Sequence, residues 1–209
     1  MKQSNNNTVE KWVRVMFLPF YLFTLLSLTV SCSESTDAID EYADWQSRND
    51  AYFEQQYQSH DKANVIRKWS LEETVATAHT DHILIDKLKE GTGTKSPYYT
   101  DTVSIHYVGR LIPSVSYPAG YEFEKSWKGT FDAETAVPSE FAVGSSDGLI
   151  NGMVTALLHM HRGDRWRVIV PYQLAYGSTA RDDIPAYSNL IFEIELKDFW
   201  SVKKGDRKD

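Results

Sequence analysis

The stretch VIVPYQLAYG, residues 168–177, and the stretch IPAYSNLIFEIEL, residues 184–196, carry most of the information about the fold of this 209-residue chain. The first is typical of an apolar strand that ends at Pro171 and is followed by a turn presenting Tyr176 beside Gly177. An irregular loop then leads to a strand in which apolar and polar residues alternate. This pattern predicts a sheet with one apolar face. It also predicts an exposed loop at the edge of the sheet, to which Gly177 gives conformational freedom.

The remaining periodic segments predict an α+β fold, with several antiparallel strands around one short helix. The helix is expected at 149–161, where apolar residues recur at helical spacing and Gly163 follows as a stop signal. The turn that follows the first strand is expected at Gly91. Strands are expected at 83–89, 102–111, 166–170 and 192–199.

Together with DTVSIHYVGRL, residues 101–111, the two quoted stretches resemble the FKBP-type peptidyl-prolyl cis-trans isomerases. The resemblance covers roughly residues 83–200, and its three motifs occur in order with nearly the family's spacing. It implies the half-barrel fold, a site between sheet and helix, and isomerisation of Xaa-Pro bonds in polypeptide clients.

Rotation about an Xaa-Pro bond needs no nucleophile, metal, cofactor or general base, because no bond is cleaved. The barrier, about 18–20 kcal/mol, comes from amide resonance. A pocket lowers it by binding the twisted amide better than the planar one, and an apolar, water-poor pocket favours the twisted form. The chain has no GxSxG, HExxH or phosphate-binding glycine motif that would indicate another chemistry.

The resemblance implies ten pocket residues, although a single tyrosine or phenylalanine in an alternating strand is usually part of the core. The family's roles place a wall tyrosine at 107, a backbone N–H donor at Ile150 and a hydroxyl donor at Tyr176. The expected pocket residues are Tyr107, Phe123, Glu124, Phe141, Leu149, Ile150, Met153, Tyr176, Ile184 and Phe192.

Three departures from the family pattern favour weak turnover. Glu124 replaces the family's aspartate in the Phe-Asp pair, with Phe131-Asp132 as the alternative match; an insertion at 112–121 precedes it. Met153 stands where the best-known members have a tryptophan floor, and methionine is a less rigid platform. The loop after Tyr176 carries Arg181-Asp182-Asp183, a more charged sequence than is usual in the family.

The N-terminus resembles the signal of a bacterial lipoprotein. Basic residues precede an apolar run at 15–30, which is short for a membrane span, and Cys32 follows as the single cysteine. Residues 28–32 form an imperfect lipobox, and the acidic 33–37 segment resembles the surface-export signals of Bacteroidetes lipoproteins. The sequence therefore predicts lipidation at Cys32 and anchoring to the outer membrane of the cell envelope; an uncleaved anchor helix is the alternative.

Residues 38–57 have an aromatic stripe at helical spacing without Pro or Gly, which predicts an amphipathic helix that Asp37 could cap. A second helix is a further expectation between Asp61 and Ala76. The stripe is expected to pack on the neighbouring domain rather than to bind a partner. The predicted organisation is a signal peptide at 1–31, a tether and helical segment at 32–79, an isomerase domain at 80–203 and a charged tail at 204–209.

The net charge of −7 argues against nucleic acid as a partner, since phosphates require clusters of lysine and arginine. Metal binding is not expected: His159 and His161 diverge on a helix, and no ligand set includes His106. The predicted function is a monomeric, membrane-tethered prolyl isomerase acting on proline-containing clients. Two rivals are a binding module with a blunted pocket and a structural lipoprotein of a surface complex.

Overall fold

The computed structural model describes residues 40–132, 135–145 and 148–201. The predictions for the signal peptide, for Cys32 and for the charged tail lie outside these residues. The described residues from Glu41 onwards belong to one compact unit. The predicted boundary at residue 80 stays a prediction.

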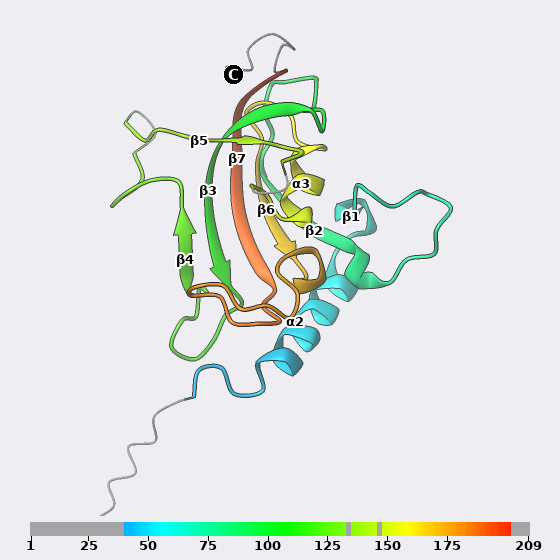
Figure 1. Cartoon of the computed structure of the whole chain (residues 1–209), viewed down its shortest axis with the longest axis vertical. Helices are drawn as coiled ribbons and strands as arrows, with labels where there is room; N and C mark the ends of the chain where they lie inside the picture. The colour runs from blue at the N-terminus through cyan, green and yellow to red at the C-terminus, as the bar shows by residue number, and fades with distance from the viewer. Residues whose placement is uncertain (1–39, 133–134, 146–147, 202–209) are drawn as a thin grey trace, which may run out of the picture. The chain divides into compact units, whose positions relative to one another are not determined.

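A seven-stranded antiparallel sheet dominates the described part of the chain, in the order β1-β2-β6-β7-β3-β4, with β5 also paired to β3 (Figure 1). The strands of this sheet are β1 (Val65–Arg67), β2 (His82–Lys89), β3 (Asp101–Leu111), β4 (Glu122–Lys125), β5 (Ser139–Ala142), β6 (Arg165–Val170) and β7 (Leu190–Ser201). The four strands predicted from alternation are confirmed as β2, β3, β6 and β7, each within two residues of its expected ends. None of the four predicted ranges includes β1, β4 or β5.

Strand β3 is the centre of the sheet. It pairs with β7 along its whole length, with β5 over its first half and with β4 near its end. The β3–β7 register shifts between Ser104 and Ile105, a bulge that bends a ladder and increases its twist. The bent β3–β7 pair places Tyr107 of β3 and Phe192 of β7 in the same region of the fold.

The short helix α3 (Asn151–Leu157) packs on one face of the sheet, against β2 and β6. Six of its seven residues are buried, and the main core cluster lies between it and the inward-facing strand residues. The predicted helix at 149–161 is therefore too long. After Leu157 the chain makes tight turns in which the Met160 N–H bonds to the carbonyls of Ala156 and Leu157, and these turns bury Met160.

Helix α2 (Trp45–Ser59) packs on the opposite face of β2, β6 and β7. Its Phe53 contacts Leu84 of β2 and Ile169 of β6, which point away from α3. The unbroken apolar runs at 83–85 and 168–170 follow from this arrangement, because strands covered on both faces lose their alternation. The expectation that the aromatic stripe packs on the neighbouring domain agrees with these contacts.

Two details of the N-terminal prediction are wrong. The helix begins at Trp45 rather than at 38, after turns in which the Trp45 N–H bonds to the Tyr42 carbonyl. No second α-helix forms between Asp61 and Ala76. Three short 3₁₀ helices occur in the described chain: η1 (Lys62–Asn64) leads into β1, η2 (His79–Asp81) precedes β2, and η3 (Tyr172–Leu174) follows β6. The β-branched Val65 and Ile66 pair with β2 instead of continuing a helix.

Candidate active site

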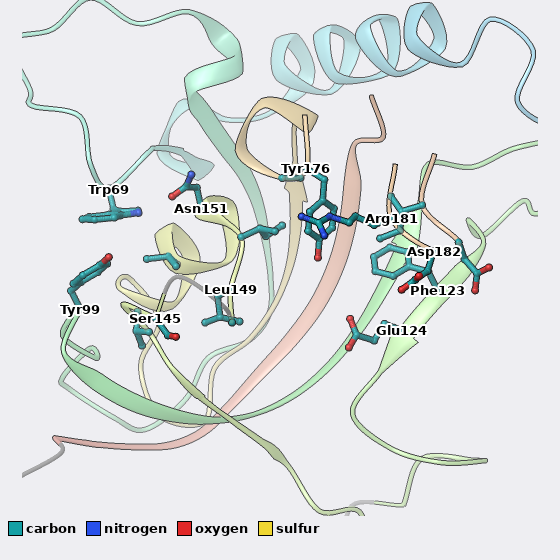
Figure 2. A pocket seen from close by; sticks show the side chains of 17 residues that line it. Trp69, Tyr99, Phe123, Glu124, Ser145, Leu149, Asn151, Tyr176, Arg181 and Asp182 are labelled. Atoms are coloured by element: carbon teal, nitrogen blue, oxygen red, sulfur yellow. The ribbon is translucent and has the colours of Figure 1, made fainter. Parts of the chain in front are cut away.

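A cleft of about 940 Å³ opens between α3, the start of β4 and the loop at 177–189 (Figure 2). Of the ten residues that the sequence predicted, six line this cleft directly: Phe123, Glu124, Leu149, Ile150, Tyr176 and Ile184. The other four lie in or against the core cluster behind it: Tyr107, Phe141, Met153 and Phe192. The fold therefore brings all ten to one region, from β3, β4, β5, α3, β7 and two loops.

Tyr107 connects the core to the cleft wall. Its hydroxyl donates to the carboxylate of Glu124 at 2.7 Å, and its ring meets Phe141 edge to face at 5.9 Å between centroids. Burial, and then the hydrogen bond to Glu124, raise the pKa of the Tyr107 phenol well above its ordinary value. The phenol therefore stays protonated and holds Glu124 against the wall at any physiological pH.

Phe123 lines the adjacent wall, and the Phe192 ring packs behind it, perpendicular, at 5.8 Å between centroids. Gly109 of β3 makes this packing possible: a Cβ there would lie 2.5 Å from Phe123 and 2.8 Å from Phe192. The glycine of the HYVG motif is therefore explained by ring packing rather than by backbone conformation.

Phe131-Asp132, the alternative match to the family's Phe-Asp pair, lies elsewhere. The Phe131 ring packs against Trp127 and His106, beside a separate small cavity of about 130 Å³. Phe123-Glu124 is the pair that reaches the cleft.

The other side of the cleft is a loop with a tight turn at its tip. Arg181 and Ile184 bond to each other through their backbones, so that Asp182 and Asp183 form the turn, with Asp182 at φ 34°. The Arg181 guanidinium lies 5.6 Å from the centre of the Tyr176 ring, a cation–π contact. Burial raises the pKa of Tyr176, so its hydroxyl is a hydrogen-bond donor over the physiological range.

Ile150 is the N-cap residue directly before α3: its carbonyl accepts the Val154 N–H, and its own backbone is extended. Met153, the expected floor, is 5% exposed and is not among the residues that line the cleft. Its role beneath the site stays a prediction.

Sequence reasoning missed several residues of the cleft, above all the aromatic pair Trp69 and Tyr99 at the end far from Arg181 (Figure 2). Trp69 comes from the segment where a helix was expected, and it was the one aromatic side chain there. The others that line the cleft are Val143, Ser145, Gly148, Asn151, Val154, Ala175, Arg181, Asp182 and Asp183. Within the residues described, no three His, Cys, Asp or Glu side chains are grouped so that they could hold a metal ion.

A half-barrel sheet around one short helix, with an aromatic-walled cleft between them, defines the class of FKBP-like proteins. The family model for FKBP-type peptidyl-prolyl cis-trans isomerases matches residues 93–197, and this chain belongs to that family.

Relatives of known name support this assignment. The chain is 34% identical to the macrophage infectivity potentiator of Trypanosoma cruzi, over 60% of this chain and 55% of that protein. It is 33% identical to FK506-binding protein 1A of Neurospora crassa, over 60% of this chain and 95% of the relative. A crystal structure of a peptidyl-prolyl cis-trans isomerase from Pseudomonas syringae has a TM-score of 0.52 at 28% identity, covering 75% of this chain and 94% of that one. The match spans about half the length of the first curated relatives.

Proposed function

We propose that this chain is a peptidyl-prolyl cis-trans isomerase that assists the folding of exported, proline-containing polypeptides. The observation that carries the proposal is the cleft itself, which is lined by apolar side chains such as Phe123, Ile150 and Ile184 beside the Tyr176 hydroxyl, which stays protonated. An Xaa-Pro bond isomerises in tens to hundreds of seconds without help, so a catalyst has a kinetic task wherever such chains fold.

Each part of the cleft has a role in that reaction. Phe123, Ile150 and Ile184 would enclose the proline ring and exclude water, which favours the twisted amide with its smaller charge separation. The Tyr176 hydroxyl and, by resemblance to the family, the Ile150 backbone N–H would hold the flanking carbonyls. No covalent bond forms, and no residue has to change its protonation state.

The test is the rate at which Xaa-Pro peptides relax from cis to trans with the purified chain. Wild type should accelerate relaxation at micromolar concentration, and Ile150→Asp should abolish the acceleration, because it puts a charge where the proline ring must be desolvated. Val137→Asp is the matched control, since Val137 is 78% exposed and lies outside the cleft. It should retain wild-type rates. If wild type does not accelerate cis-to-trans relaxation, the proposed isomerase activity is wrong.

A binding module with the same fold is the second candidate, favoured by the charged turn at the cleft mouth and by Met153 in place of tryptophan. Such a module would bind proline peptides in the cleft without accelerating their relaxation. Titration of a labelled peptide beside the rate measurement separates the two functions.

We further propose that the protein is anchored to the outer membrane through a lipidated Cys32 and acts as a monomer. The support is the sequence signal, which lies outside the described residues. In the described ranges, no helix has both the length and the apolar character needed to cross a membrane. Cys32→Ser should release the protein from the membrane fraction, because acyl chains supply the affinity. Persistent fatty-acid labelling of Cys32→Ser would overturn the assignment, and an uncleaved anchor helix would keep the variant in the membrane.

A further inference from the structure

The cleft extends beyond the residues that enclose a proline ring. Its volume of about 940 Å³ lies near the top of the range of about 300–1,000 Å³ for small-molecule sites. Figure 2 shows Trp69 and Tyr99 at the end opposite Phe123 and Arg181, with Leu149 between the two ends. Trp69 lies outside the segment that matches the family model, 93–197, whereas Tyr99 lies inside it.

The position of Trp69 is fixed by hydrogen bonds. Its backbone N–H donates to the hydroxyl of Thr155 on α3 at 3.3 Å, and the same hydroxyl donates to the Asn151 carbonyl at 2.8 Å. The Arg67 guanidinium donates to the carbonyls of Glu72 and Val75, which closes the segment that follows Trp69. The indole is therefore presented by an ordered turn attached to the helix of the active site.

Tyr99 is fixed from the other side. A Cβ on Gly144 would lie 2.5 Å from the Tyr99 ring, so the ring rests directly on a glycine backbone. The turn that carries Tyr99 is held by the buried Asp101, whose carboxylate accepts the Tyr98 N–H at 2.9 Å and the Ser201 hydroxyl at 2.7 Å. The Tyr99 ring is therefore positioned by its attachment to the start of strand β3.

The two rings meet at 4.5 Å between centroids and 30° between planes, yet remain 36% and 42% exposed. Two rigid aromatic side chains, held in place and still open to solvent, offer large apolar area at little entropic cost. Tryptophan and tyrosine are enriched among the residues that dominate binding energy for this reason. Their exposed surface is continuous with the rest of the cleft.

We propose that Trp69 and Tyr99 form an aromatic subsite that binds an aromatic side chain of the client polypeptide, at least two residues from the proline. This proposal rests on the proposed isomerase function, because it places the client across the same cleft. The subsite would make the protein prefer clients that have an aromatic residue at that distance from the isomerising bond.

The experiment uses proline peptides with alanine fixed directly before proline. Phenylalanine, arginine or alanine is placed two, three or four residues away on either side. For wild type, kcat/KM should be about two- to tenfold higher with phenylalanine than with alanine at one of these positions, the range expected for one aromatic contact. In Trp69→Ala and in Tyr99→Ala this ratio should fall towards one.

Tyr98→Ala is the matched control, because Tyr98 is adjacent, 73% exposed and outside the cleft. It should keep the wild-type ratio. A ratio near one for wild type at every position, with alanine peptides still accelerated, would overturn the subsite and leave the isomerase intact. A preference for arginine over phenylalanine would also overturn it. If wild type accelerates no peptide, the proposed isomerase function is wrong, and the subsite is then tested by anisotropy titration of the labelled peptides. Tighter binding of the phenylalanine peptide than of the alanine peptide supports the subsite, and equal binding refutes it.

Discussion

The two faces of the sheet are covered by two helices of different character. Helix α3 is short, nearly all buried, and leaves beside it an open cleft, whereas α2 is longer and buries only a stripe at Trp45, Asn49 and Phe53. The family match, residues 93–197, includes α3 but not α2, β1 or β2. The face with α3 is therefore open at the cleft, and α2 closes the other.

The two faces meet at the loop that carries the cleft's mouth. Asn49 accepts the backbone N–H of Asn189 at 2.7 Å, and Asn189 in turn accepts the Tyr172 N–H. The Trp45 indole donates to the Ser188 hydroxyl at 2.8 Å, which donates to the Pro185 carbonyl. The closed face therefore holds the loop of the open face in place.

The largest effect on stability should follow from removing a buried side chain between α2 and the sheet. Phe53→Ala removes a ring that is 2% exposed and should lower the free energy of unfolding by about 3–5 kcal/mol. Gln55→Ala, exposed on the same helix, should change it by less than about 0.5 kcal/mol. Urea unfolding measures both. Equal midpoints for the two variants would show that α2 does not belong to the folded core.

A smaller effect should come from removing the hydrogen bond between Asn49 of α2 and Asn189 of the loop. Asn49→Ala leaves the buried Asn189 N–H without its acceptor and should cost about 1–3 kcal/mol of stability. Because the loop at 177–189 loses an anchor, KM for proline peptides should rise more than kcat falls. Gln55→Ala again serves as the control. Unchanged kinetic constants in a destabilised but folded Asn49→Ala would mean that α2 supports the fold alone.

The smallest effect concerns Tyr107 at the base of the open face. Tyr107→Phe removes one hydrogen bond to Glu124 and should cost about 0.5–1.5 kcal/mol near neutral pH.

The pH dependence of this variant has a definite sign. The pKa of Tyr107 is raised on folding, so at high pH the native state keeps a proton that the unfolded state releases near pH 10. Stability from this group is complete below about pH 10 and is lost as the pH rises above it. Tyr107→Phe should therefore lose stability less steeply than wild type above pH 10 in thermal melts. Parallel curves would mean that Tyr107 ionises as readily in the native state as in the unfolded chain.

The sequence by itself determined the elements whose signal is local. Alternation in 102–111 and 192–199, and the order of the motifs around Tyr107, Ile150 and Tyr176, predicted the central strands and the family. The expected pocket residues also gather in one region of the fold. Each of these follows from a periodicity or a motif that neighbouring residues carry.

Tertiary structure decided what depends on distant partners. Val65 and Ile66 became a strand because β2 offered an edge, and the helix at 149–161 ended early because Met160 turns into the core. Trp69 reached the cleft through a hydrogen bond to Thr155, 86 residues along the chain. No local pattern encodes such contacts, since their free energy arises only when the sheet has brought both partners together.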